Sequence, residues 1–372
     1  MEQIVNEKTE RVFLVGVQIT RNIEGATGPE ETAHRMEELA ALAEAAGMEV
    51  CGQTVQNLDA PNQATYIGPG KVEEVKSAVE MLHADLVIFD ASLSPSQLRN
   101  EQDALGVAVM DRTTLILEIF ASMARTREAK LQVEAARLQY LLPRLVGLHD
   151  ALSRQGGGSG AMSNKGAGET KLELDRRYLE KRLQFLRKEL KTIEQERATQ
   201  RKKRAGSGMP RVALVGYTNA GKSTLMNAML ETYGGEDAKE RQVFEKDMLF
   251  ATLDTTVREI TPAGRLSFLL SDTVGFVDHL PTQLVEAFHS TLEEAAEADL
   301  LLQVVDDSDP HAAQQIEITN RTLHQLEADQ SPMIIIYNKA DLTQGEERLP
   351  MVREIGDRSY TIHLSAKQRI GL

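Results

Sequence analysis

Apolar and polar positions in the first 110 residues alternate between two repeating patterns. Four short apolar runs, typical of strands, lie at residues 11–18, 49–56, 85–90 and 107–110. Amphipathic patterns between them predict helices over residues 29–46, 71–83 and 95–105. Because strands and helices alternate, we expect residues 1–112 to form a small N-terminal α/β subdomain on a four-stranded parallel sheet.

From Thr113 the pattern becomes helical and is expected to run without a break to about Ala151. Leucines then recur with heptad spacing at 131, 138 and 145, with further leucines at 141 and 148. A second heptad helix has rows at Leu172, Leu179, Leu186 and Ile193, and at Leu183 and Leu190. We expect an antiparallel two-helix coiled-coil arm over residues 113–205, projecting from the globular part, whose helices bury their seams only against each other.

The two heptad helices are joined by a glycine-rich tip at residues 155–168, QGGGSGAMSNKGAG. Such a segment has few side chains to pack and is expected to be disordered unless a partner binds it. A basic, glycine-containing linker at residues 201–208 then leads into a third domain, residues 206–372. Apolar runs at 212–215, 266–271, 333–337 and 360–364 predict its buried strands.

The sequence G-x-x-x-x-G-K-S begins directly after the first of these strands and opens a predicted helix at 224–230. In this context it predicts a phosphate-binding loop, because glycines let the backbone N–H groups converge on phosphate oxygens beside a helix N-terminus. The expected nucleotide-binding residues of the loop are Gly216, Tyr217, Thr218, Asn219, Ala220, Gly221, Lys222, Ser223 and Thr224.

Residues of three segments are expected to act on the terminal phosphates and Mg²⁺. Lys222 would reach the β- and γ-phosphates, and the Ser223 hydroxyl would bind the metal. Within residues 250–256, a Thr, for which we select Thr256, could complete the metal shell only while γ-phosphate is present. In the D-x-x-G sequence, Asp272 would hold Mg²⁺ through water and the Gly275 N–H would meet the γ-phosphate. We therefore expect catalytic roles for Lys222, Thr256 and Gly275.

Base specificity is predicted by two motifs that follow the last two strands. In Asn338-Lys339-Ala340-Asp341, the Asp341 carboxylate can accept both N1–H and the exocyclic N–H of guanine, and adenine has no donor at N1. The Ser365-Ala366-Lys367 segment would place a backbone N–H against guanine O6. GTP and GDP, rather than adenine nucleotides, are the expected cofactors, together with Mg²⁺.

Phe276 follows Gly275, at the position where GTPases of the Ras type carry a water-orienting Gln. An aromatic ring cannot polarise water. We therefore expect hydrolysis by the isolated protein to be slow and to be accelerated by a partner or a cation.

Charge is distributed unevenly along the 372 residues. The net charge is −14, but residues 125–204 carry +10 and the remainder carries −24. Either the arm has an ordinary solvated helical face, or it contacts the phosphate backbone of structured RNA. The single Cys51 excludes an internal disulfide, and neither a membrane-spanning run nor a signal peptide is present. We expect a cytoplasmic monomer that does not span a membrane and does not bind DNA.

Together these residues resemble the HflX family of ribosome-associated GTPases over nearly the whole chain. The resemblance rests on Tyr66 to Lys71, Ala121 to Leu145, Gly166 to Arg177 and Phe250 to Arg258. It implies a GTPase that binds the large ribosomal subunit, directs the arm tip toward the peptidyl transferase centre and splits stalled or stressed ribosomes. It also implies that hydrolysis is stimulated by the ribosome. Within the wider class of GTPases that replace the catalytic Gln by an apolar residue, Asn219 matches a position that resembles a potassium ligand.

The chain departs from the family pattern in two places. Lys165 and Ala167 stand in the tip where the family usually has Arg and Pro. The sequence ends shortly after Lys367, so we expect a fragment whose P-loop domain lacks its last helix.

Two rival functions belong to other classes. One is a GTP-dependent signalling switch that binds a protein partner through the coiled-coil arm. The other is an RNA-remodelling NTPase that uses ATP through Gly68 to Lys71. For that segment a plain turn is favoured over an anion nest, because it has neither the six-residue spacing nor a Ser or Thr after the Lys.

Overall fold

A computed structural model describes residues 9–20, 28–155, 165–205, 208–234, 256–277, 294–328, 330–343, 353–356 and 359–372. The chain divides into two compact units. The first unit comprises Met1–Ser122 with Glu134–Arg187, and the second comprises Met123–Val133 with Lys188–Leu372. Among the described residues, no helix has the length and apolar character needed to cross a membrane.

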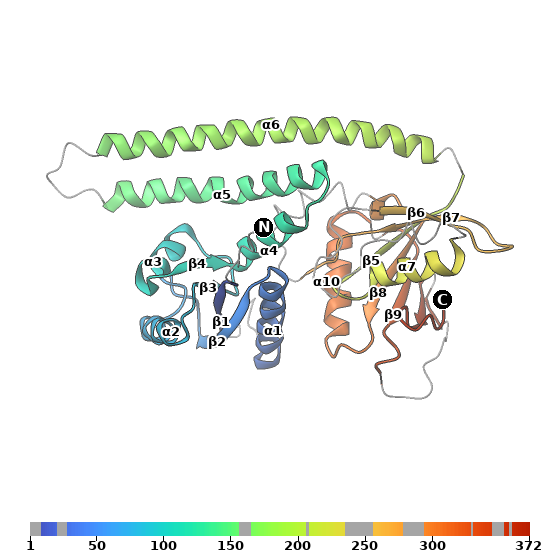
Figure 1. The fold of residues 1–372 in the computed structure, drawn as a ribbon, viewed down its shortest axis with the longest axis horizontal. Helices are drawn as coiled ribbons and strands as arrows, with labels where there is room; N and C mark the ends of the chain where they lie inside the picture. The colour runs from blue at the N-terminus through green and yellow to red at the C-terminus, as the bar shows by residue number, and fades with distance from the viewer. Residues whose placement is uncertain are drawn as a thin grey trace, which may run out of the picture. The chain divides into compact units, whose positions relative to one another are not determined.

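The first unit is built on the parallel four-stranded sheet that the sequence predicts (Figure 1), in the order β2-β1-β3-β4. Its strands are β1 (Arg11–Ile19), β2 (Glu49–Leu58), β3 (Leu86–Phe89) and β4 (Ala108–Asp111). The helices between them are α1 (Pro29–Ala45), α2 (Pro69–Leu82) and α3 (Pro95–Leu105). Val15, Val87 and Phe89 are fully buried in one cluster, so this sheet has its own core.

Local capping explains where two of these helices begin. The Ser94 side chain accepts from the Gln97 N–H, and the Gln97 side chain accepts from the Ser94 N–H, which forms a capping box at α3. At α2, the Gly68 N–H donates to the Gln56 side chain at 2.8 Å, and Lys71 pairs with Glu74 at 2.7 Å. Because these groups already have protein partners, the Gly68–Lys71 segment is a helix start rather than an open anion nest.

The expectation of an unbroken helix from Thr113 to about Ala151 is wrong. The structure has α4 (Arg112–Met123) and α5 (Arg127–Gln155), with a break between them. The Thr126 hydroxyl accepts from the Ala129 N–H at 3.1 Å and caps α5 afresh, because a Thr side chain competes with continued helix for backbone donors. Helix α4 is buried, and its Arg112 pairs with Asp90 at 2.8 Å and with Glu38.

Helix α5 pairs with α6 (Lys165–Ala205) as two antiparallel helices (Figure 1). The Arg182 guanidinium makes two hydrogen bonds to Glu134, at 2.7 and 2.8 Å. Farther along α6, Glu189 pairs with Arg127, which precedes Glu134 in α5, so the two helices run antiparallel. Leu183 and Leu186 are buried as the heptads predict. The tip predicted at residues 155–168 lies mostly outside the described residues.

Two details of the expected arm are corrected by the way α5 packs. Leu141, expected in the seam, is 37% exposed, and the buried positions of α5 include Ala129, Val133 and Ala136. In addition, α5 packs on the sheet of the first unit, where the Asp111 carboxylate accepts from Tyr140 and, at 2.8 Å, from Arg144. The two helices therefore do not bury their apolar faces only against each other.

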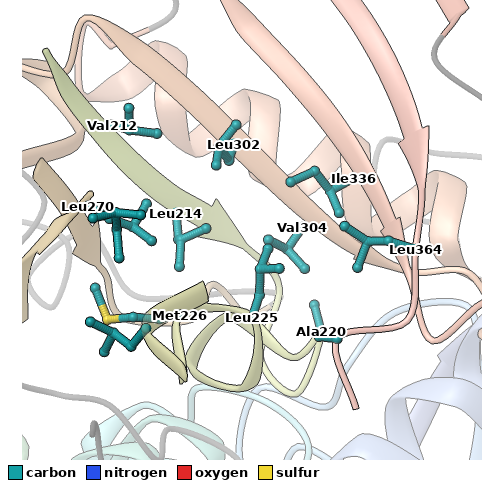
Figure 2. Close-up of a cluster of buried hydrophobic side chains, with 13 residues drawn as sticks. Val212, Leu214, Ala220, Leu225, Met226, Leu270, Leu302, Val304, Ile336 and Leu364 are labelled. Atoms are coloured by element: carbon teal, nitrogen blue, oxygen red, sulfur yellow. The ribbon is translucent and has the colours of Figure 1, made fainter. Parts of the chain in front are cut away.

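The second unit contains a seven-stranded sheet in the order β10-β11-β9-β8-β5-β7-β6. Its elements are β5 (Arg211–Gly216), α7 (Lys222–Tyr233), β6 (Thr256–Ile260), β7 (Phe268–Asp272), β8 (Leu300–Asp306), α10 (Ala312–Gln325), β9 (Met333–Asn338), β10 (Arg353–Gly356) and β11 (Ser359–His363). The sequence pattern predicts β5, α7, β7, β9 and β11, whereas β6, β8, α10 and β10 were not predicted. Figure 2 shows Ala220 and Leu364 in one buried cluster with Leu225 and Val304, so the core reaches the loops at the strand ends.

Candidate nucleotide-binding site

The predicted phosphate loop lies at the carboxyl end of β5, near the middle of the second sheet. Strand β5 pairs in parallel with β8 on one side and with β7 on the other. Connections leave β5 in both directions along the sheet, and ligands of open α/β sheets bind at such reversal points. The topology therefore places the loop where a ligand is expected.

Close backbone approaches explain why glycine stands at both ends of this loop. Gly216 has φ 144°, and a Cβ there would lie 2.2 Å from the Val304 carbonyl oxygen. Gly221 has φ 90°, and its Cβ would lie 2.3 Å from the Asn338 side-chain nitrogen. Asn219, with φ 59°, adopts the left-handed conformation that Asn tolerates better than most residues. Larger residues at the two glycines would displace the loop.

Lys222 opens α7 and is held inside the loop. Its side chain is 6% exposed, and its ammonium donates to the carbonyls of Gly216 at 3.0 Å and Tyr217 at 2.7 Å. Burial lowers the pKa of Lys222 to about 8, and the nearby charge of Asp272 opposes that shift. The ammonium is thus a desolvated cation that phosphate oxygens could attract.

Ser223 and Asp272 come from different elements and meet in the structure. The Ser223 hydroxyl donates to the Asp272 carboxylate at 2.6 Å, and Asp272 is fully buried at the end of β7. A hydroxyl beside a carboxylate offers the hard oxygen ligands that Mg²⁺ prefers. Among the described residues no three His, Cys, Asp or Glu side chains gather as a metal cluster. A cation here would therefore need further oxygens from phosphate or water.

Thr256 begins β6 and stands opposite Asp272 in the antiparallel ladder. Its hydroxyl lies 3.9 Å from the Met226 sulfur, toward α7. The structure thus places Thr256 on the strand next to Asp272. The rest of the expected switch segment, residues 250–255, lies outside the described residues.

Gly275 and Phe276 lie directly against the phosphate loop. The Thr218 N–H donates to the Phe276 carbonyl at 2.8 Å, and the Phe276 N–H donates to the Gly216 carbonyl at 3.1 Å. The Phe276 side chain is 1% exposed. A Cβ on Gly275 would lie 2.8 Å from Thr218 Cα and 3.0 Å from the Lys222 ammonium, so this position leaves no room for a side chain.

Asn338 connects both base-recognition motifs to the phosphate loop. Its side-chain nitrogen donates to the Ala220 carbonyl at 2.9 Å, and its side-chain oxygen accepts from the Ala366 N–H at 3.0 Å. Asn338, Ser365 and Ala366 are buried, whereas Asp341 and Lys367 are exposed. The exposed Asp341 carboxylate can bind the edge of a base that enters from solvent. The buried Asn338 amide fixes the loops on either side of that position.

Two contacts of this site were missed by the sequence reading. Lys339 has φ 62° and pairs with Asp306, the last residue of β8, at 2.7 Å. The ring of His363 stacks on Tyr337 at 4.7 Å between ring centres. The apolar run LLLQVVD at 300–306, which ends in an acidic residue, was the available signal for β8 and Asp306. Of the remaining predicted residues, Thr224 lies in the first turn of α7.

Comparison with known families gives three matches in chain order. Residues 33–121 match the GTP-binding GTPase N-terminal family, and residues 123–204 match the GTP-binding GTPase Middle Region family. Residues 211–339 match the family described as 50S ribosome-binding GTPase. The matches together cover most of the chain.

Relatives called GTPase HflX are similar over nearly all of the chain. The protein from Caldanaerobacter subterraneus subsp. tengcongensis is 46% identical over 373 residues, which is 100% of this chain and 80% of the relative. That from Alkalihalophilus pseudofirmus is 46% identical over 341 residues, 92% of this chain and 76% of the relative. The Escherichia coli protein is 40% identical over 338 residues, 91% of this chain and 76% of the relative.

A solved structure of similar fold is the SsGBP and GDP complex. It has a TM-score of 0.50 and 24% sequence identity, and the likeness covers 96% of this chain and 94% of that one. At this identity the comparison bears on the fold alone.

Proposed function

The chain belongs to the HflX family of GTPases, and on that premise we propose that it is a cytoplasmic, GTP-hydrolysing factor that binds the large ribosomal subunit and splits or rescues stalled ribosomes. The proposed factor has three parts, which are an N-terminal α/β subdomain at residues 1–112, an arm at 113–205 and a GTPase domain at 206–372. The arm would insert toward the peptidyl transferase centre.

In the proposed complex, the phosphate loop wraps the phosphates of GTP. The Lys222 ammonium exchanges its hydrogen bonds to the Gly216 and Tyr217 carbonyls for hydrogen bonds to phosphate oxygens. It can do so without a large movement, because it already lies inside the loop that would hold the phosphates. The Gly275 N–H meets the γ-phosphate, because no side chain separates that backbone from Lys222. The Asp341 carboxylate accepts from N1–H and the exocyclic N–H of guanine. The loop at Ser365–Lys367 lies against guanine O6.

Mg²⁺ fits the pair of Ser223 and Asp272, with Thr256 as the candidate third residue. When bound there, the ion would neutralise charge that develops on the phosphates. The short hydrogen bond from Ser223 to Asp272 supports this role, because both oxygens already converge on one place. Asn219 is the proposed potassium ligand; its left-handed backbone lies at the loop surface, where its side chain is exposed.

Slow hydrolysis in the absence of a partner is proposed from the packing of Phe276. Its side chain is buried and its backbone is hydrogen-bonded to Gly216 and Thr218. Reaching an attacking water from this position would require breaking those contacts, and the ring could not polarise water in any case. We therefore propose that the ribosome supplies the group that orients the attacking water for fast turnover.

The observation that carries the ribosome proposal is a set of exposed cations along α6. They include Arg176 and Arg177, which pair at i,i+4 spacing with Glu180 and Glu173. Lys181 is exposed and has no ion pair within the part of the chain that the structure describes. Exposed cations on a rigid helix match phosphate groups at fixed spacing, such as those of folded RNA.

Sedimentation with purified large subunits tests this proposal. We expect co-sedimentation with a non-hydrolysable GTP analogue and markedly less with GDP. Substituting Arg176, Arg177 and Lys181 by Gln should weaken binding and lower its salt dependence, because each lost phosphate contact removes released counterions. Arg321→Gln is the matched control, because Arg321 is an exposed cation of the second unit that also has an i,i+4 partner, Glu317. Equal binding in both nucleotide states would contradict the proposal.

The rival that uses ATP through Gly68 to Lys71 has less structural support. The backbone N–H of Gly68 is bound to Gln56, and Lys71 is bound to Glu74 and Thr54. A phosphate would have to displace all three partners. Retained ATP turnover after Lys222→Ala would nevertheless favour that rival.

A further inference from the structure

One face of α6 carries a row of large apolar side chains that are at least half exposed. Leu174, Tyr178 and Phe185 are 59%, 69% and 50% exposed. At about 100° per residue they lie within roughly 40° of one another around the helix. Leu183 and Leu186, which pack against α5, are 7% and 0% exposed and lie roughly 80° to 180° away from these three residues around the helix. We call Leu174, Tyr178 and Phe185 the aromatic stripe.

Cations lie on both sides of the aromatic stripe. Arg177 and Lys181 flank one side and are exposed. On the other side, the Arg182 guanidinium is 5.4 Å from the centre of the Phe185 ring, where it is held by its two hydrogen bonds to Glu134. This geometry keeps one cation fixed near an aromatic face, whereas Lys181 is exposed and has no ion pair among the residues that the structure describes.

The sequence around the aromatic stripe argues against a third coiled-coil helix as its occupant. A docking helix needs apolar residues that continue every three or four positions. Along α6 the row that contains Leu174 continues with Lys181 and Lys188, and the row that contains Tyr178 and Phe185 continues with Thr192. A partner helix would therefore meet two lysines where it needs leucines.

Unpaired nucleotides have the complementary chemistry. Nucleobases stack on exposed aromatic faces whatever their identity, and the phosphates between them pair with neighbouring Arg and Lys. Resting on the proposed function, we propose that the aromatic stripe is a stacking platform for unpaired bases of the large-subunit RNA, with Tyr178 and Phe185 each receiving one base and Lys181 contacting the intervening phosphate.

A fluorescence experiment tests stacking directly, because the chain contains no Trp. Phe185→Trp places a single indole on the stripe, and Gln184→Trp places one at the adjacent exposed position. A single-stranded RNA 12-mer should quench the first indole strongly and the second weakly, and an RNA duplex should quench neither. Equal quenching of the two variants, or none, would overturn the proposal.

Binding to purified large subunits tests the same platform in the assembly. Tyr178→Ala and Phe185→Ala should each lower affinity by about 5- to 150-fold, the range for loss of one stacked base. Tyr178→Phe and Gln184→Ala should leave the affinity near that of the parent chain. If large subunits do not bind the parent chain, the proposed function is contradicted. Quenching of the Phe185→Trp indole by single-stranded RNA then still tests whether bases stack on the aromatic stripe.

Other occupants give different outcomes. Association with a ribosomal protein that survives ribonuclease and is lost in Phe185→Ala would overturn RNA stacking in favour of a protein partner. Concentration-dependent self-association that is lost in the same variant would overturn it in favour of a second copy of this chain. Thermal unfolding of each variant serves as the folding control.

Discussion

The side-chain amide of Asn338 donates to the main-chain carbonyl of Ala220 at 2.9 Å and joins the end of β9 to the phosphate loop. The same amide accepts from the Ala366 N–H at 3.0 Å. One side chain thus links its own loop to the phosphate loop, 118 residues earlier in the sequence, and to the loop at Ala366, 28 residues later. A motif usually assigned to base recognition therefore also shapes the phosphate site.

Asn338→Ala tests this link. The change leaves the buried Ala220 carbonyl and Ala366 N–H without their partner, and each unmatched group costs about 1–3 kcal/mol. We expect the dissociation constant for GDP to rise at least about tenfold and the thermal midpoint to fall, as measured by calorimetry. An unchanged GDP affinity would show that the link is incidental.

Asp341→Asn should change base choice without changing stability, because Asp341 is exposed. An Asn can donate to the O2 of xanthine and accept from its N1–H, but it cannot accept both N–H groups of guanine. We expect GTP affinity to fall by at least about a hundredfold and xanthosine triphosphate to become the better ligand. Competition binding with both nucleotides is the measurement, and a variant that still prefers GTP would contradict the assignment.

The buried Asp111 carboxylate connects α5 to the first sheet and accepts from Leu93, Thr114, Tyr140 and Arg144. Removing the charge by Asp111→Asn should cost about 3–5 kcal/mol, because it breaks a buried pair with Arg144. Denaturant unfolding, with amide exchange in α5, measures the effect. Arg137→Gln is the control, because its pair with Glu118 is half-exposed and should contribute less than about 1 kcal/mol.

Glu101 predicts a pH dependence that is independent of nucleotide. It is fully buried in α3, and burial raises its pKa to about 8. Between its ordinary pKa of 4.5 and about 8, the folded state keeps a proton that the unfolded state loses. The contribution of Glu101 to the free energy of unfolding should therefore be greatest below pH 4.5. It should fall by up to about 1.4 kcal/mol per pH unit as pH rises toward 8.

Glu101→Gln stays neutral at every pH and should remove that part of the fall. Denaturant unfolding of both proteins at pH 5.5 and pH 8 measures the difference, which should favour the variant only at the higher pH. Parallel stability curves for the two proteins would contradict a protonated Glu101.

Elements with strong local patterns were predictable from the sequence. The strands of the first sheet, the phosphate loop between β5 and α7, and the paired helices α5 and α6 follow from apolar periodicity and glycine spacing. The break before α5 was not, because the Thr126 cap overrides a sequence of good helix formers. Nor was the packing of α5 on the sheet, because Tyr140 and Arg144 give no sign in sequence of their shared partner Asp111. Asn338 was found as a motif residue, but its bond to Ala220 depends on folding.

The rate of GTP hydrolysis with and without purified large ribosomal subunits tests the central claim most directly. We expect slow turnover by the chain alone, a sharp rise when subunits are added at low salt, and loss of that rise when Arg177 and Lys181 are replaced by Gln. A rate that stays the same with and without large subunits at low salt would contradict it.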